Sequence, residues 1–319
     1  MEDLKKFSGV IPPVIIPLKG DRTLDPVSFE RSIDRMIDAG VHGLFFLGSS
    51  GEVAFLTNDE RERVLRAALE IVDGRVPVLV GIIDMETMRV IDQAKRVSRC
   101  EGVDALVATA PFYALGGPTE TERHFRAIRE STELPLFAYD LPVSVHTKLN
   151  PEMLIRLGTD GVLQGVKDSS GDDVQFRWLM IENEEAGHPM QLLTGHEVCV
   201  DGVLLGGADG SVPGLANIDP HSYVEMWHCA KKGEWDRVTE LQDHLARLMM
   251  MTRRVKATVG FGAGVGAFKT ALWQMGIFET NQMREPVAAL QGEDVMSIVR
   301  VLRENGVVPK DSLMRQAWD

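Results

Sequence analysis

Short apolar runs alternate along the chain with longer stretches in which apolar residues recur every three or four positions. The runs are rich in valine, isoleucine and leucine and predict buried strands, whereas the longer stretches have the period of amphipathic helices. Because the runs are continuously apolar, we expect burial on both faces, as in a parallel sheet covered by helices. The eight predicted strands are residues 10–18, 43–47, 76–83, 105–108, 134–139, 162–167, 190–193 and 207–212.

Helical patterns fill the spaces between these strands. Asp25-Pro26 illustrates how they begin, with a capping residue before a proline at the first helical position. The patterns at 172–185 and 197–205 are short or irregular, which leaves a doubly wound sheet as an alternative. Eight strand–helix units favour an α/β fold of the (β/α)8 TIM-barrel type, in which active-site residues lie at the C-terminal strand ends. The clearest predicted helices are 26–39, 58–72, 86–100, 119–131 and 151–157.

After residue 219 only helical patterns remain, at 221–231, 235–255, 265–275 and 295–304. The first of these completes the barrel. We therefore predict a barrel catalytic domain at residues 1–232 and a C-terminal helical extension, packed on the barrel, at residues 233–319. Gly262–Ala267 matches a relaxed G-x-G-x-x-G/A pattern but follows a polar helix instead of a strand, so we expect a loop that leads into a helix.

The composition is that of a globular protein, because 44% of the 319 residues are hydrophobic and 25% are charged. The net charge of −13, with no stripe of basic residues, argues against nucleic acid or an anionic membrane as a partner. Three widely spaced cysteines and a polar N-terminus indicate a reduced cytoplasmic location. No apolar run approaches the roughly 18 residues of a membrane span.

Lys167 is a single cation at the end of the apolar run that begins at Val162. Burial at a strand end disfavours the ammonium form, which makes a free amine available to attack a carbonyl group. A structural lysine paired with Asp168 is the alternative that the local sequence leaves open. The eight histidines show neither an H-E-x-x-H motif nor paired metal spacing, so we expect no metal site and no cofactor.

Two other polar groups follow predicted strands at the same end of the barrel. Ser49 and Ser50 lie in a glycine-rich loop, whose hydroxyls and backbone N–H groups can hold a carboxylate without a metal. An ordinary turn is the alternative for this loop, and we expect Glu52 to be a structural acceptor within it. Tyr139 ends the fifth strand, where its phenol can shuttle protons to a substrate oxygen. The alternative for Tyr139 is a half-buried aromatic residue whose hydroxyl bonds to water.

Taken together, these segments resemble the pyruvate-dependent class I aldolase family that includes dihydrodipicolinate synthase and N-acetylneuraminate lyase. The resemblance covers nearly the whole chain, with the segments in the same order and at similar spacing. Its segments are Gly48–Glu52, Pro111–Tyr113, Tyr139–Pro142, Gly165–Gly171 and Gly207–Gly210.

The resemblance implies a barrel homotetramer, a dimer of dimers, in which Lys167 forms a Schiff base with pyruvate or another 2-oxo acid. It also implies that Tyr139 relays protons, joined in the synthase branch by a tyrosine of a neighbouring subunit that Tyr113 matches. Lys167, Tyr139 and Tyr113 are thus the candidate catalytic residues. The candidate substrate-binding residues are Gly48, Ser49, Ser50, Ser144, Glu197 and Gly210.

The departures from the family pattern concern the second substrate. The synthase branch has an arginine for a substrate carboxylate where this chain has Ser144, which argues against lysine-precursor synthesis. The lyase branch has an Asp-Glu pair for sugar hydroxyls where this chain has Glu197-Val198, which argues against sialic acid. Asp140 replaces an asparagine. His146 replaces a glycine, and a substrate contact and an exposed loop position stay equally open for it.

The sequence therefore predicts a metal-free lyase that acts on pyruvate or a 2-keto-3-deoxy sugar acid through a Lys167 iminium. Aldol cleavage, aldol addition and dehydration are all compatible with this intermediate, with an aldehyde as the second substrate in the aldol reactions. The alternatives are a 4-hydroxy-tetrahydrodipicolinate synthase and a Schiff-base dehydratase. A non-catalytic 2-oxo-acid-binding protein is the alternative of another class.

Overall fold

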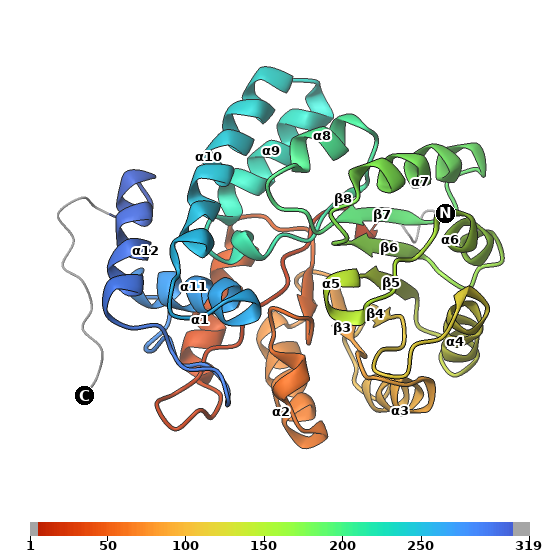
Figure 1. Ribbon diagram of the computed structural model, residues 1–319, viewed down its shortest axis with the longest axis horizontal. Coiled ribbons are helices and arrows are strands. Elements are labelled where there is room, and N and C mark those ends of the chain that lie inside the picture. The colour runs from red at the N-terminus through yellow and green to blue at the C-terminus, as the bar shows by residue number, and fades with distance from the viewer. Residues whose placement is uncertain (1–5, 309–319) are drawn as a thin grey trace.

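The computed structural model describes residues 6–308, in which eight parallel strands form one curled sheet surrounded by helices (Figure 1). Neighbouring strands in the sheet follow the order β1-β8-β7-β6-β5-β4-β3-β2. This is the order expected when each strand–helix unit is placed beside the preceding one. The strands are β1 (Gly9–Val10), β2 (Leu44–Phe46), β3 (Val78–Gly81), β4 (Ala105–Thr109), β5 (Leu136–Asp140), β6 (Gly165–Asp168), β7 (Gln191–Thr194) and β8 (Gly210–Ser211).

Backbone hydrogen bonds on both sides of the first strand close the sheet into a barrel. On one side Gly9 of β1 is paired with Gly210 of β8. On the other side, Phe45 of β2 donates its N–H to Pro12 O at 2.9 Å and accepts from Val14 N at 2.9 Å. The predicted (β/α)8 barrel is thus confirmed, and the doubly wound alternative is wrong.

The first predicted strand, residues 10–18, is much shorter than its apolar pattern indicates. Only Gly9 and Val10 form a ladder, and Pro13 makes an isolated bridge to Phe45. Proline has no backbone N–H to donate, so Pro12, Pro13 and Pro17 prevent a continuous ladder although the segment stays buried.

Helices connect consecutive strands and cover the outside of the sheet, with capping residues at several helix starts. The carboxylate of Asp25 accepts from Ser28 N at 3.3 Å at the start of the first helix, as its position before Pro26 predicts. The barrel helices are α1 (Pro26–Asp38), α2 (Asn58–Val72), α3 (Thr87–Val97), α4 (Pro118–Glu130), α5 (Pro142–Val145), α6 (Pro151–Thr159), α7 (Asp173–Glu185), α8 (Val200–Leu205) and α9 (Pro220–Lys232), with 3-10 turns η2 (Val53–Phe55) and η3 (Gly214–Asn217).

The C-terminal part consists of α10 (Trp235–Arg254), α11 (Gly260–Gln274) and α12 (Gly292–Glu304), which lie together at one side of the barrel (Figure 1). The predicted loop at Gly262–Ala267 is wrong, because these residues form part of α11. A Cβ added at Gly266 would lie 3.3 Å from Leu290 Cγ, so the glycine permits close packing of a mainly apolar helix. The domain division at residue 232 stays a prediction, and residues 309–319 of the predicted extension lie outside the described residues.

The inside of the barrel is a packed apolar core. It leaves the C-terminal strand ends as the place where polar side chains can gather. Between residues 6 and 308, no helix combines the length and apolar character that a bilayer crossing requires. The buried residues of the interior cluster are Phe7, Ile11, Phe45, Leu79, Ala105, Val107, Phe137, Tyr139, Leu193 and Val212.

Candidate active site

Lys167 and Tyr139 lie directly opposite each other on adjacent strands at the C-terminal end of the barrel. Their Cα atoms are partners in the β5–β6 ladder. The Lys167 side chain points into the barrel, where Nζ is 4.2 Å from the centroid of the Tyr139 ring and 4.9 Å from that of Phe45. Lys167 is only 5% exposed. The lysine amine is thus held between two aromatic rings at the mouth of the apolar core.

Among the described residues, Asp168 pairs with Lys148 and Ser170 and not with Lys167. Successive residues of a strand point to opposite faces, so Asp168 faces away from the barrel interior. Its carboxylate accepts from the backbone N and the hydroxyl of Ser170, both at 2.8 Å, and from Lys148 Nζ at 3.4 Å. Lys167 therefore faces the barrel interior, toward Tyr139 and Phe45.

The loop after β2 brings hydroxyl groups to the same place. Ser49 Oγ is 3.5 Å from the Tyr139 hydroxyl, and both serines of the loop are partly exposed. A Cβ added at Gly214 of η3 would lie 3.5 Å from Ser50 Oγ and 3.1 Å from a carboxylate oxygen of Glu197. The loops after β2, β7 and β8 thus meet around Lys167 and Tyr139.

Gly48 and Gly195 allow these close approaches because any side chain at either position would clash. A Cβ added at Gly48 would lie 2.6 Å from Cε1 of Phe45. A Cβ added at Gly195 would lie 2.0 Å from Ser169 Oγ and 3.2 Å from Lys167 Cε. Gly195, which the sequence analysis missed, therefore brings the loop after β7 against the lysine. Its position two residues after the predicted strand 190–193 was the available signal.

Glu197 is held in place by contacts of both its side chain and its backbone. Its carboxylate accepts from Leu215 N at 2.6 Å. Its carbonyl oxygen accepts from the Tyr223 hydroxyl at 3.0 Å and from Gln242 Nε2 at 3.2 Å. Burial raises the pKa of the Glu197 carboxyl, while the bond from Leu215 and the charge of Lys167 act in the opposite direction. The carboxyl is thus held near the Ser50 hydroxyl, within the electrostatic influence of Lys167.

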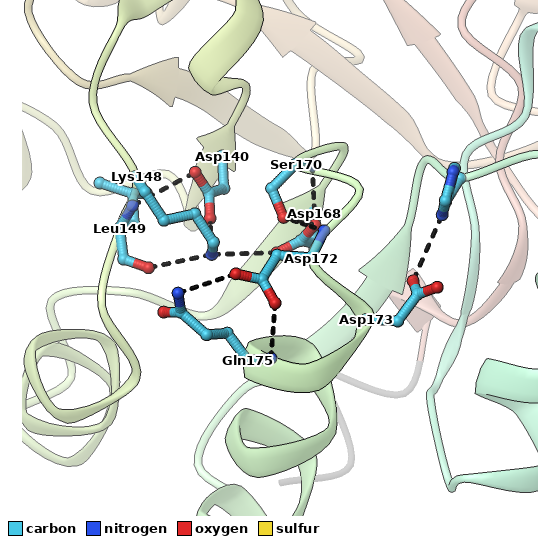
Figure 2. Close-up of polar contacts among 9 residues, drawn as sticks. Asp140, Lys148, Leu149, Asp168, Ser170, Asp172, Asp173 and Gln175 are labelled. Carbon is cyan, nitrogen blue, oxygen red and sulfur yellow. Dashed lines mark hydrogen bonds and ion pairs between the residues drawn. The ribbon is translucent and has the colours of Figure 1, made fainter.

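A buried charged cluster that the sequence analysis did not identify lies on the outer side of β5 and β6 (Figure 2). Asp140 and Asp168 are Cα partners, one residue after Tyr139 and Lys167, and both accept from Lys148 Nζ. Burial raises the pKa of Asp140 to about 6, against the opposing effect of Lys148. The available signal was an acidic residue following each of the two site residues.

Three of the other candidate residues lie on the surface of the single chain. Tyr113 is 91% exposed, in the loop after β4, with a backbone φ of +77°. Ser144 is exposed in α5, and His146 is exposed at its C-terminal cap. A single chain therefore does not bring Tyr113 to Tyr139, and a role across a subunit interface stays a prediction.

Gly210 lies in the ladder rather than in a loop. It is buried, paired with Gly9 on one side and with Leu193 on the other. Leu193 is also the partner of Lys167, so Gly210 is level with the lysine two strands away. A Cβ at Gly210 would lie 2.1 Å from Gly9 O. Glycine is therefore needed here because β8 and β1 approach each other closely. Its predicted contact with substrate stays a prediction.

Glu52 is a hydrogen-bond acceptor, as predicted, but its partners lie outside its own loop. Lys269 of α11 donates to one carboxylate oxygen and Arg284 N donates to the other, at 3.2 Å for the latter. The residue next to the Ser49–Ser50 loop is thus held by the C-terminal part of the chain.

Comparisons with known proteins agree on one family. Residues 6–305 match the Dihydrodipicolinate synthetase family. The chain is 31% identical to the "Probable 2-dehydro-3-deoxy-D-pentonate aldolase YjhH" of Escherichia coli K12, over 77% of this chain and 81% of that protein. It is 28% identical to a 4-hydroxy-tetrahydrodipicolinate synthase of Phenylobacterium zucineum, over 76% of this chain and 81% of the other.

A solved structure extends this likeness to the fold. YagE, a prophage protein of the dihydrodipicolinic acid synthase family from Escherichia coli K12, was solved in complex with pyruvate. It superimposes with a TM-score of 0.89 at 26% identity, covering 95% of this chain and 99% of YagE.

Proposed function

Because this chain belongs to the dihydrodipicolinate synthetase family, we propose that it is a lyase in which Lys167 forms a Schiff base with pyruvate or a related 2-oxo acid. The observation that carries the proposal is the position of Lys167 Nζ. It is buried against the rings of Tyr139 and Phe45, and faces the hydroxyl-bearing loop after β2. The pyruvate bound to YagE supports the same class of ligand.

The first chemical step is attack of the neutral Lys167 amine on the ketone carbon of the 2-oxo acid. The amine loses its proton, the carbinolamine loses water, and an iminium ion remains. The Tyr139 hydroxyl, level with Lys167 on the next strand, is placed to move these protons. Ser49 and Ser50, with backbone N–H groups of their loop starting at Gly48, are the groups we assign to the substrate carboxylate.

The iminium then withdraws electrons from the adjacent carbon. In a 2-keto-3-deoxy sugar acid, removal of the proton from the hydroxyl on carbon 4 lets the bond between carbons 3 and 4 break, which releases an aldehyde and leaves an enamine of pyruvate. Protonation of carbon 3 and hydrolysis of the iminium then release pyruvate and the Lys167 amine. The reverse reaction joins the same two fragments. Loss of a hydroxyl group as water, in place of this cleavage, would make the enzyme a dehydratase. We assign Glu197 to a hydroxyl group of the sugar part, because its carboxyl and the Ser50 hydroxyl approach the same point at Gly214 and its charge interacts with that of Lys167. The name of the aldolase relative from Escherichia coli favours the cleavage reaction.

Borohydride trapping tests the Schiff base directly. The protein is incubated with pyruvate and borohydride, and peptide mass spectrometry locates the added reduced pyruvyl group. We expect it on Lys167 and not on Lys148, the partly exposed lysine that contacts Asp168. Lys167→Ala and Lys167→Arg should remain unlabelled and inactive with an unchanged circular dichroism spectrum. Labelling elsewhere, or none where a related aldolase is labelled, rejects the mechanism. Labelling without turnover of any 2-keto-3-deoxy acid would favour a binding protein.

A 4-hydroxy-tetrahydrodipicolinate synthase is the second candidate, favoured by the name of the Phenylobacterium relative. Condensation with aspartate semialdehyde brings a second carboxylate, which a fixed cation recognises best. Ser144 offers an exposed hydroxyl instead. We expect little product from pyruvate and aspartate semialdehyde in a reductase-coupled assay, compared with cleavage of 2-keto-3-deoxy acids. The opposite ranking would establish the synthase.

We also propose that the active protein is a homotetramer in the cytoplasm. The exposed Tyr113, with its left-handed backbone, supports a subunit contact at the rim of the barrel. Light scattering after size-exclusion chromatography measures the assembly. A monomer with full activity would exclude any role for Tyr113 across an interface.

A further inference from the structure

A second group of functional side chains lies at the C-terminal rim, outside the set assigned to the Schiff-base chemistry. Asp173 is the first residue of α7, while His196 and Cys199 belong to the loop after β7. A carboxylate oxygen, an imidazole nitrogen and a thiol sulfur of these residues all lie within 4.8 Å of one another. We propose that Asp173, His196 and Cys199 form a binding site for a divalent transition-metal ion of the zinc class.

The separation of the imidazole and carboxylate donor atoms suits such an ion. His196 Nδ1 is 3.3 Å from Asp173 Oδ1, which is long for a hydrogen bond between these groups. Two ligand atoms at about 2.0–2.1 Å from a tetrahedral zinc ion are roughly 3.3–3.4 Å apart. The pair therefore already has the spacing of one edge of the coordination sphere.

The chemistry of the donors selects the type of ion. Mg²⁺ and Ca²⁺ prefer oxygen ligands, so a site with one imidazole and one thiol is a poor site for either ion. Zn²⁺ and Co²⁺ accept oxygen, nitrogen and sulfur together. An ion pair between His196 and Asp173 alone requires no thiol beside it, and it leaves the position of Cys199 unexplained.

The turn that carries His196 and Cys199 is held in place by its own contacts. His196 N donates to Thr194 Oγ1 at 3.0 Å, and Cys199 N donates to His196 O at 3.3 Å. Gln242 of α10 donates to the carbonyl oxygen of Glu197, between the two ligands, at 3.2 Å. The two donors are thus presented from a fixed backbone, which reduces the ordering cost of binding an ion.

Asp173 is positioned by the start of its helix. The carboxylate of Asp172 accepts from Gln175 N at 3.0 Å and from Gln175 Nε2 at 2.8 Å, and Asp172 N donates to Ser170 Oγ at 3.1 Å. Figure 2 shows this chain of contacts running from Ser170 to the helix that carries Asp173. The third ligand therefore also stands on a capped and fixed element.

The site is open to solvent and follows directly after Gly195, which lies near Lys167. The side chains of His196 and Asp173 are 37% and 56% exposed, so an ion can enter from outside. A Cβ added at Gly195, directly before His196, would lie 3.2 Å from Lys167 Cε. Three protein ligands leave a fourth position for water or for an oxygen of a bound small molecule. The Schiff-base chemistry proposed above needs no metal, so the site goes beyond that function.

Cobalt binding gives the most direct test. The full chain is stripped of metal with a chelator and titrated with Co²⁺, then with Zn²⁺ in competition. We expect one Co²⁺ per chain, tetrahedral visible bands, a thiolate-to-cobalt charge-transfer band in the near ultraviolet, and displacement by Zn²⁺. The charge-transfer band of the unmodified protein reports sulfur coordination without any variant.

Variants then assign the ligands. Cys199→Ser should abolish the charge-transfer band, and His196→Gln and Asp173→Asn should each weaken Zn²⁺ binding by about 100-fold or more, beyond the effect of outer-shell changes. Asp201→Asn, in the first turn of α8, and Cys100→Ser are matched controls for charge and for a thiol. Both should bind the ion as the unmodified chain does.

Three outcomes would overturn the site: no stoichiometric binding, no charge-transfer band, or equal Zn²⁺ affinity in the folded Cys199→Ser variant. Lys167→Ala should bind Co²⁺ normally, because the lysine is not a ligand. A failure of the Schiff-base proposal therefore leaves the metal test unaffected, and a failure of the metal test leaves the borohydride result unaffected.

Discussion

Glu52 and Lys269 form an ion pair in which neither side chain is accessible to solvent. Glu52 belongs to the loop that carries Ser49 and Ser50, whereas Lys269 lies in α11 and also donates to Gln282 O at 2.9 Å. Burial lowers the pKa of Lys269, and the charge of Glu52 opposes this effect. The C-terminal part of the chain thus holds the loop that we assign to the substrate carboxylate.

Lys269→Met should lower the free energy of unfolding by about 3–5 kcal/mol, because it leaves the Glu52 carboxylate buried without its partner. Urea unfolding measures this change. The double variant Glu52→Gln/Lys269→Met should regain much of the loss, since no charge then remains unpaired. Lys256→Met removes an exposed pair with Glu293 and should change stability by less than about 1 kcal/mol. Equal changes in the free energy of unfolding for Lys269→Met and Lys256→Met would show that the buried pair stabilises the protein no more than the exposed pair does.

Tyr139→Phe should lower kcat by about 100-fold or more, because the variant keeps the ring beside Lys167 but loses the hydroxyl that moves protons. KM for the 2-oxo acid should change much less. Steady-state kinetics with a 2-keto-3-deoxy acid separate the two effects, since a rise in KM alone would assign Tyr139 to binding. Tyr113→Phe is the comparison: a similar loss of kcat there would indicate that an exposed tyrosine reaches a neighbouring subunit's site.

The buried His124 should make the protein less stable in mild acid. Burial lowers the pKa of His124 from 6.5 to about 4, and its ring contacts Thr87 Oγ1 and the carbonyl oxygen of Thr109. The unfolded chain binds the proton more tightly, so stability is lost as the pH falls from about 6.5 to about 4, by up to roughly 3 kcal/mol. His124→Gln should flatten the unfolding free energy over this range, whereas His221→Gln, at an exposed position, should not. Parallel curves for the two variants would contradict the assignment.

Asp140 should have the opposite effect in an overlapping pH range. The pKa of its carboxyl is raised from 3.8 to about 6, so the folded chain binds the proton more tightly than the unfolded chain. The contribution of Asp140 to stability therefore rises as the pH falls from about 6 to about 4. Compared with Asp140→Asn, the unmodified protein should gain stability on acidification through this range. Urea unfolding at a series of pH values checks the sign, and a difference that stays constant would refute it.

Much of the barrel could be predicted from the sequence because its signals are local. Helix α2 has the predicted bounds, residues 58–72, since its apolar period is reinforced by a capping box between Thr57 and Glu60. The ends of the strands are also indicated by the local sequence. The C-terminal ends of parallel strands meet at one rim, so Lys167, Tyr139 and the Ser49–Ser50 loop could be expected together before any coordinates. The first strand was overestimated because its apolar pattern outweighed its prolines.

Other relationships were decided only by the tertiary structure. Lys269 meets Glu52 across 217 residues of sequence, and Lys148 joins two aspartates of neighbouring strands. Local hydrophobic periodicity cannot indicate such partners, because it reports which face of an element is buried and not which element covers it. The convergence of Asp173 with His196 and Cys199 has the same origin. A single sequence thus determined the barrel and the strand end at which Lys167 lies, while the packing of loops and helices around the rim decided which charged groups and which carboxylate, imidazole and thiol atoms meet there.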